Sequence, residues 1–479
     1  MSPPSQYPSV AIPPRLPLVV ETSNRGSNTR FDARLVNCYL EVSKESELYI
    51  YRRPGLGSYQ TVSAGTFGRG VFFWKGIVYS IFGDKLYADG VEVGTGLDTT
   101  TGGVSGNGVY NFSEILGSTP QLVLGNGSEA YAYDTIGGLS ATLHSIDSDY
   151  PEETVKGFSY LNGATYVGRE DAKIQGSAIN SVAVAGDWDP LNVIEAQIEP
   201  DPGIAINKQL VYVIAFNSWS TEVFFDQGNS TGSPLGSVQG SKISYGCANS
   251  DSIQRIDDVL FWASINQTAS LQIAMMKQLS LEIISTEPID RLLNAVDYST
   301  IFSWQLKIDG HSFYVITFKN SNLTLAYDIV QKEWFQWTDS DGNYFPIVAS
   351  TYDSGGNRIL QHENNGLLYT ASTETYKDLD KPIQVDIYTP NFDAGTRRKK
   401  QLNQLVVIAD QIEGSTLYAR CSDNDYKSWS SFRAIDLSQE LPRIVNCGTF
   451  RRRAYNFRHT AATFFRVQAI EVQYDVGTL

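Results

Sequence analysis

Residues 70–90 read Gly-Val-Phe-Phe-Trp-Lys-Gly-Ile-Val-Tyr-Ser-Ile-Phe-Gly-Asp-Lys-Leu-Tyr-Ala-Asp-Gly. Three runs rich in β-branched and aromatic residues are separated by the pairs at 75–76 and 83–84, and the pair at 89–90 ends the third run. Each pair contains glycine, which accepts the positive φ angles that two-residue hairpin turns require. The segment therefore predicts a four-stranded antiparallel meander.

The same pattern recurs through the middle of the chain. It is clear at 309–337 and weaker at 158–167, 257–262 and 358–369. Small antiparallel sheets need neighbours to cover their faces, and radial stacking supplies them. We therefore predict an all-β fold with an irregular β-propeller built of antiparallel meanders. A string of β-sandwiches is the alternative, which the absence of the Cys-Trp-Cys spacing of immunoglobulin domains disfavours.

The two ends of the chain differ from its middle. The first 30 residues contain six prolines, which exclude a regular helix or a central strand. Residues 391–479 have a net charge of +4, whereas the preceding 390 residues have −19. Turn-forming residues also gather at 389–395. Helix signals are scarce, and the best of them is at 284–296, where Pro288 fits a first turn.

These contrasts predict three parts. Residues 1–60 are expected to form an extended Pro-rich arm and strands that associate with a platform. Residues 61–380 are expected to form the propeller, and residues 381–479 a smaller, β-sandwich-like C-terminal platform domain. Since neither the arm nor the C-terminal part has enough local pattern to fold alone, we expect them to dock together.

The composition argues against several classes of function. A net charge of −15 disfavours binding to a phosphate backbone. The longest apolar runs, such as 210–216, are far shorter than the roughly 20 residues that span a bilayer, so no membrane helix is expected. No secretory signal is visible at the start, which predicts synthesis and folding in a cytosol. The four cysteines lie far apart and are expected to be free thiols.

Catalytic motifs are absent from the sequence. The four histidines stand apart from one another and from cysteine, and the acidic pairs at 152–153, 187–189 and 257–258 are typical of turns. Ser422–Trp429 resembles the Asp-box of sialidases but has Asn424 and Tyr426 at key positions, and such a box is a hairpin signature. We therefore predict no catalytic, cofactor-binding or metal-binding residues, no cofactor, and a protein that is not an enzyme.

Two basic clusters are the candidate functional residues. They suit a contact surface for an acidic partner, such as another copy of this acidic chain or DNA. The alternative is a strand edge that its charges keep solvated. The candidate protein-interface residues are Arg397, Arg398, Lys399, Lys400, Arg451, Arg452 and Arg453.

The order of several short motifs resembles the packaged-DNA stabilisation proteins of short-tailed bacteriophages, which are tail-hub or nozzle subunits. The similar segments begin with Leu-Val-Asn-Cys-Tyr-Leu at 35–40 and end with the basic 451–458. The others are at 53–56, 160–163, 189–201, 217–225, 245–248, 257–262, 284–286, 397–400 and 422–429. Residues 95–145 contain no motif that resembles the family, and we expect the largest departures from it there.

The resemblance implies a structural protein of the virion tail. It implies a homohexameric ring of propeller subunits with a small β-rich platform, bound to portal-adaptor proteins above and to a tail needle, tailspikes or fibres below. Such a hub retains packaged DNA, and double-stranded DNA passes through its channel during genome ejection without sequence-specific binding. The rival hypothesis is a carbohydrate-binding or glycan-cleaving propeller, such as an adhesin or depolymerase, suggested by the aromatic content and the Asp-box-like segment.

Overall fold

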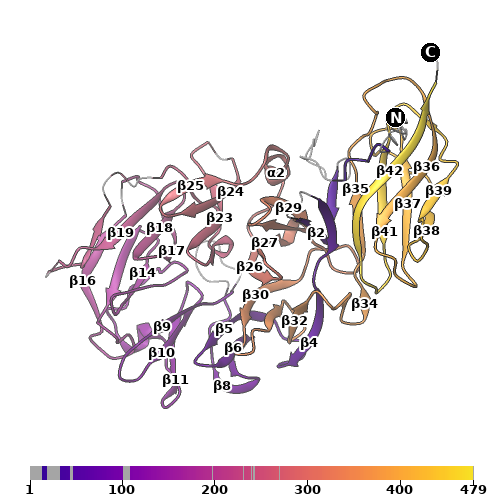
Figure 1. The fold of residues 1–479 in the computed structure, drawn as a ribbon. Coiled ribbons are helices and arrows are strands. Elements are labelled where there is room, and N and C mark those ends of the chain that lie inside the picture. The colour runs from indigo at the N-terminus through magenta and orange to yellow at the C-terminus, as the bar shows by residue number, and fades with distance from the viewer. Residues whose placement is uncertain are drawn as a thin grey trace, which may run out of the picture. The chain divides into compact units, whose positions relative to one another are not determined.

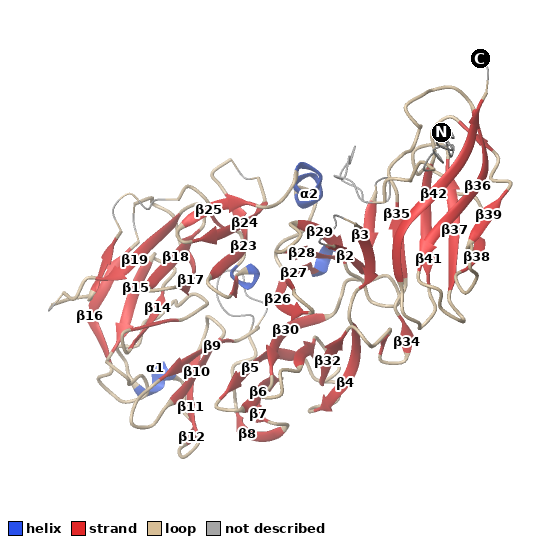
Figure 2. Cartoon of the chain, viewed as in Figure 1, coloured by secondary structure: helices blue, strands red, loops and turns tan. Residues whose placement is uncertain are grey.

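A computed structural model describes most of the chain, which forms two compact units. Unit 1 comprises Met1–Arg53 and Lys381–Leu479, and unit 2 comprises Pro54–Asp380. The second unit thus starts at Pro54 rather than at residue 61. Strands dominate both units and helices are few (Figure 2). The described residues are 13–18, 33–43, 47–100, 108–196, 198–229, 231–238, 240, 243–268 and 270–477.

Unit 2 is a β-propeller whose described residues form seven blades in chain order (Figure 1). Blades 1 and 2 contain β5 (Gly68–Trp74), β6 (Ile77–Phe82), β7 (Lys85–Ala88) and β8 (Val91–Thr95), then β9 (Asn111–Ile115), β10 (Gln121–Gly125), β11 (Ala130–Asp134) and β12 (Gly138–Leu139). Blades 3 and 4 contain β13 (Ser159–Leu161), β14 (Ala164–Gly168), β15 (Lys173–Ser177) and β16 (Trp188–Glu195), then β17 (Gly203–Gln209), β18 (Tyr212–Asn217), β19 (Thr221–Asp226) and β20 (Leu235–Ser237).

The remaining blades complete the ring. Blade 5 contains β21 (Gly246–Cys247), β22 (Gln254–Ile256), β23 (Val259–Ile265), β24 (Gln272–Lys277) and β25 (Ser280–Ile283). Blade 6 contains β26 (Ile301–Ile308), β27 (His311–Phe318), β28 (Leu323–Asp328) and β29 (Glu333–Gln336). Blade 7 contains β30 (Ile347–Tyr352), β31 (Arg358–His362), β32 (Leu367–Ser372) and, from the start of the unit, β4 (Gly55–Thr61). The short β33 (Lys377–Asp378) pairs with β4 in parallel.

The ring closes because β4 pairs antiparallel with β32, so that blade 7 combines strands from both ends of the unit. Strands of each blade contact strands of the next, as β9 does with β13 and β18 with β21, and β30 contacts both β26 and β5. Apolar side chains fill the space between adjacent blades, and four tryptophans are almost wholly buried: Trp188, Trp262, Trp304 and Trp337. The predicted all-β propeller is thereby confirmed.

Local turn chemistry explains the individual blades. The meander expected at 70–90 is observed as β5 to β8, with Lys75 and Asp89 at positive φ beside their glycines. The segment at 309–337 forms β27 to β29. The helix expected at 284–296 is α2 (Glu287–Leu293), with Thr286 at its N-cap and Pro288 in the first turn. The other α-helix in the described residues is α1 (Leu143–Ile146).

Unit 1 is a β-sandwich of two antiparallel sheets. The first has the order β2 (Cys38–Val42), β3 (Leu48–Arg52), β42 (Arg466–Val476), β36 (Lys400–Ala409) and β39 (Arg443–Val445), and β40 (Thr449–Phe450) also pairs with β36. The second contains β1 (Arg34–Val36), β35 (Val385–Tyr388), β41 (Ala454–His459), β37 (Thr416–Ser422) and β38 (Arg433–Asp436). Leu405 and Ile470 of the first sheet and Leu417 and Phe457 of the second are fully buried in the core.

Part of the Pro-rich arm lies on β42. The Leu16 amide donates to the Ile470 carbonyl, and the Val472 amide donates to the Pro14 carbonyl, each at 2.8–2.9 Å. Leu16 and Leu18 are buried. The arm residues 13–18 therefore contribute to unit 1 both as an added strand and as core.

All four cysteines fall within the described residues and are free, and Cys38 and Cys247 are buried. None of the helices in the described part of the chain has the length and apolar character that crossing a membrane demands.

His459 makes the stability of unit 1 sensitive to acid. The Arg52 guanidinium, which only donates, contacts His459 Nδ1, so Nε2 carries the proton and donates to Ser415 Oγ at 2.8 Å. Burial and the nearby Arg52 charge lower the pKa of His459 to about 3. The unfolded chain keeps an ordinary histidine pKa of about 6.5, so only it binds the proton as the pH falls between these values. The free energy of unfolding of unit 1 therefore has its highest value above about pH 6.5 and decreases as the pH falls toward 3.

We expect this effect to cost unit 1 about 2–3 kcal/mol at pH 4.5 relative to neutral pH. Hydrogen exchange of β41 amides at a series of pH values measures the loss. In His459→Gln the slope between pH 6.5 and 4.5 should flatten, because glutamine does not titrate. An unchanged slope in that variant would show that other groups cause the acid sensitivity.

Candidate protein-interface site

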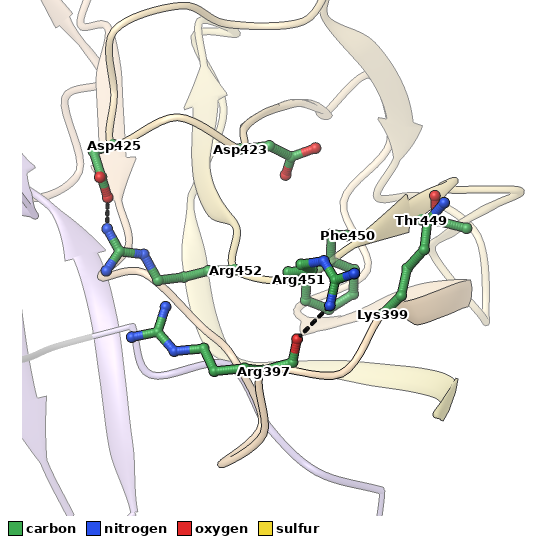
Figure 3. A pocket seen from close by; sticks show the side chains of 8 residues that line it. All are labelled: Arg397, Lys399, Asp423, Asp425, Thr449, Phe450, Arg451 and Arg452. Carbon is green, nitrogen blue, oxygen red and sulfur yellow. Dashed lines mark hydrogen bonds and ion pairs between the residues drawn. The ribbon is translucent and has the colours of Figure 1, made fainter. Parts of the chain in front are cut away.

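The two predicted basic clusters meet at one place in unit 1. Residues 397–400 lead into β36, and residues 451–453 connect β40 to β41. Lys400 pairs with Phe450 across the sheet, and Arg451 Nη1 donates to the Arg397 carbonyl at 2.9 Å. An open hollow of about 590 Å³ lies beside them, and Figure 3 draws the side chains that line it. It is lined by Arg397, Lys399, Asp423, Asp425, Thr449, Phe450, Arg451 and Arg452.

Lys400 is a structural residue, which corrects the expectation that it belongs to the interface. Its side chain is fully buried, and Nζ donates to the carbonyls of Asp393, Thr396 and Arg398 at 2.6–2.9 Å. Three carbonyls directed at one ammonium fix the loop that carries Arg397, Arg398 and Lys399. Lys400 thus positions the cations without presenting its own charge.

Arg453 is likewise buried, and the expectation that it contacts a partner is corrected for the same reason. Its guanidinium holds both carboxylate oxygens of Asp423 at 2.7 and 2.8 Å and also donates to the Cys447 and Thr449 carbonyls. The neighbouring Arg452 is partly buried and pairs with Asp425 (Figure 3). These arginines tie the 423–425 turn to the strand that precedes β41.

The cations that remain at the surface are Arg397, Arg398, Lys399 and Arg451, all of which are exposed. Arg397 approaches the Asp393 carboxylate at 3.8 Å, but its side chain is 75% exposed, so this pair is weak. The two carboxylates that line the hollow are already bound to Arg453 and Arg452. The hollow therefore offers uncompensated positive charge, which suits an acidic group on a partner.

The Asp-box-like segment supplies the acidic wall of this hollow. Asn424 Oδ1 accepts from the Ser428 amide, and Ser422 Oγ accepts from the Tyr426 amide, so the segment forms a closed turn after β37. Asp425 and Tyr426 adopt positive φ, and the Tyr426 hydroxyl donates to the Thr389 carbonyl. The sequence indicated a hairpin here, but only the fold shows that Asp423 and Asp425 face the arginines, and that Thr449 and Phe450 line the hollow.

The other acidic pairs lie in turns of unit 2. Asp187 accepts from Ser181 Oγ and the Val184 amide, and Asp257 pairs with Lys307. Within the described ranges, no three His, Cys, Asp or Glu side chains gather as a metal site would require.

Replacing Lys400 with methionine is expected to lower the free energy of unfolding of unit 1 by about 2 kcal/mol, because three carbonyls lose a charged donor. Arg398→Met, two residues away and exposed, should change it by less than about 0.5 kcal/mol. Hydrogen exchange of β36 and β42 amides separates the two outcomes. Equal effects for the two variants would mean that Lys400 does not hold the loop.

Several solved structures match this chain at low sequence identity and low TM-score. A streptogramin B lyase is 9% identical, with a TM-score of 0.39, over 70% of this chain and 98% of that chain. The computationally designed Ika8 protein is 10% identical, with a TM-score of 0.38, over 67% of this chain and 99% of that chain. The N-terminal domain of Nup159 is 8% identical, with a TM-score of 0.38, over 71% and 99%.

No curated protein matches the sequence. A family model does match, and it covers residues 16–355, which include part of the arm, the strands β1 to β3 and all but the last strands of the propeller. The matched region is well over half of the chain, and its described fold is the one observed for unit 2. The chain therefore belongs to the phage stabilisation family described as "Bacteriophage P22 Gp10, beta-propeller".

Proposed function

We propose that this protein is a tail-hub or nozzle subunit of a bacteriophage virion, which closes the portal-adaptor channel and retains packaged DNA. The observation that carries the proposal is the family match over residues 16–355. Membership of a phage stabilisation family favours a structural role in the virion over a catalytic one. Assembly would take place in the cytoplasm of the bacterial host, before the protein joins the tail.

The distribution of charge supports this role. A conduit that double-stranded DNA must leave quickly should not adsorb it, and a net charge of −19 over residues 1–390 repels phosphates. The exposed cations of the hollow are confined to the C-terminal segment, where they suit an acidic protein surface. We propose that the partners are further copies of this chain in a homohexamer, portal-adaptor proteins above, and a tail needle, tailspikes or fibres below.

The glycan hypothesis has little support from the site. One of its two grounds, the Asp-box-like segment, lies in unit 1, and the two carboxylates of that segment form ion pairs with Arg452 and Arg453.

A complementation experiment tests the proposed function. Phage particles that lack this protein should package DNA and then lose it, so that the DNA becomes accessible to nuclease. Adding the purified chain to freshly filled particles should restore protection, and electron microscopy should show added density below the adaptor. Particles that keep their DNA without the protein would refute the proposal. Restoration by an unrelated acidic propeller would do so as well.

A further inference from the structure

The turns at one end of blades 2 to 4 carry an unusual number of exposed apolar side chains. In each blade, one turn joins the first and second strands and another joins the third and fourth strands. Both turns lie at the same end of the sheet, because neighbouring strands run in opposite directions. We call these six turns the apolar tip face. Their described residues are 116–120, 135–137, 162–163, 178–187, 210–211, 227–229 and 231–234.

Contacts between blades place these turns next to one another. Asn162 Nδ2 of blade 3 donates to Asp226 Oδ2 at the start of the blade 4 turn, at 2.6 Å. A Cβ added to Gly117 of blade 2 would lie 3.0 Å from the Asn180 carbonyl oxygen of blade 3. The first strands β9, β13 and β17 also contact one another in order. The tips of the three blades therefore form one continuous surface.

Six large apolar side chains on this surface are between 40% and 86% exposed. They are Leu116, Ile136, Ile179, Val184, Leu210 and Val211. The second-to-third turns at the opposite end of the same blades are Asn-Gly-Ser-Glu at 126–129, Arg-Glu-Asp-Ala at 169–172 and Ser-Trp-Ser at 218–220. Single exposed apolar residues are ordinary, whereas such a concentration on one face marks a protein-binding surface.

The β17–β18 turn strengthens this reading. Leu210 adopts a φ of +52°, a left-handed conformation that glycine or asparagine normally supplies in a two-residue turn. An exposed Leu-Val pair is thus kept at the tip against the local backbone preference. Hydrogen bonds from the Ile136 amide to Asp134 and from the Val184 amide to Asp187 hold other tips in fixed conformations. Preformed tips lose little conformational entropy on binding.

We propose that the apolar tip face docks a second copy of this chain, and that the docked surface is the basic rim of unit 1 of that copy. The basic rim consists of Arg397, Arg398, Lys399 and Arg451 together with the exposed Val445 and Val476. Val476 pairs with Lys400 and Val445 with Gln404 on β36, the strand that directly follows Arg397, Arg398 and Lys399, so the two exposed valines lie beside the basic segment. The inference rests on the self-assembly that the proposed function includes.

Charge complementarity favours this occupant over another protein. None of the six turns contains Lys or Arg, whereas Asp134, Asp187 and Asp226 lie in or beside them and are partly exposed. An apolar and acidic face fits an apolar and basic one, and the basic rim presents both features. Two different patches that meet in this way make a heterologous contact, which generates a ring when the rotation closes.

Light scattering and sedimentation velocity of the full chain, over a concentration series, test the proposal. Ile179→Lys with Val211→Lys should weaken self-association at least about tenfold, as should Arg397→Glu with Lys399→Glu and Arg451→Glu. The control Phe67→Lys with Ile198→Lys places the same charges on exposed apolar residues of connections at the opposite end, and should associate like the wild type.

The decisive experiment mixes the two defective variants. The lysines on the tip face of one variant can then pair with the glutamates on the basic rim of the other, so association should return. A wild-type chain that stays monomeric at all concentrations, or a tip variant that associates like the control, would overturn the proposal. So would a mixture that fails to pair. DNA retention by virions is a separate readout, so failure of the proposed function leaves the association result standing.

Discussion

Replacing Lys156 with methionine is expected to lower the free energy of unfolding of unit 2 by about 3–5 kcal/mol. Lys156 Nζ lies 2.5 Å from Asp251 Oδ1, and the two side chains are 2% and 5% exposed. Lys156 precedes blade 3, whereas Asp251 belongs to the short helix Ser250–Ser252 of blade 5. Burial lowers the pKa of Lys156, and the Asp251 charge opposes this effect. Removing the lysine would leave a carboxylate buried without its cation.

Tryptophan fluorescence during denaturant unfolding reports this loss, because seven of the eight tryptophans lie in unit 2. Lys85→Met is the matched control, because both side chains of its ion pair with Glu92 are at least 40% exposed and solvent screens their attraction, so its loss should change the stability of unit 2 far less. The double variant Lys156→Met with Asp251→Asn should cost less than the sum of the single changes, because no lone charge remains. Similar losses for Lys156→Met and Lys85→Met would contradict the prediction.

Gly366→Ala should destabilise unit 2 by about 4 kcal/mol through the strand that closes the ring. Gly366 has a φ of +73°, and an added Cβ would lie 1.7 Å from the Ser63 carbonyl oxygen. Its own carbonyl accepts from the Val62 and Ser63 amides that follow β4. In Gly366→Ala the backbone must therefore shift at the β4–β32 pairing, where blade 7 joins the two ends of unit 2.

Gly356→Ala separates the two causes of that loss. Gly356 has a similar φ of +77°, but no heavy atom lies within 4 Å of its added Cβ. Its cost should be only the left-handed strain, about 1 kcal/mol. Fluorescence gives both stabilities, and hydrogen exchange of β4 should quicken only in Gly366→Ala. Equal losses in the two variants would show that contact with Ser63 is unimportant.

The residues of the turns made the strand boundaries of some blades predictable from the sequence, whereas in other blades the turns gave no such signal. The pairs at 75–76 and 309–310 contain glycine, and the hairpins around them follow from short-range preference. The run at 210–216 reads as one apolar strand, yet β17 ends at Gln209 and β18 begins at Tyr212 because Leu210 takes a positive φ. Blade number was equally hidden, since no local pattern in 55–61 indicates a partner at 367–372.

The sequence predicted that basic residues cluster at the candidate site. It did not predict which of them are buried and structural and which are exposed. Seven consecutive or neighbouring cations look alike in a sequence. Lys400 is buried because three carbonyls of its own preceding loop converge on it, and Arg453 because Asp423 comes from a turn 30 residues earlier. Burial of a basic side chain depends on such distant acceptors, which composition and spacing do not reveal.

The placement of β4 also governs when this protein can fold during its synthesis. About 300 residues separate β4 from β32, and a ribosome adding about 5–20 residues per second needs roughly 15–60 s to deliver the partner. Folding of unit 1 is delayed further, because β1 and β3 pair with strands from the last hundred residues, which are synthesised last. A prematurely terminated chain therefore exposes unpaired strand edges, which makes truncated products prone to aggregation.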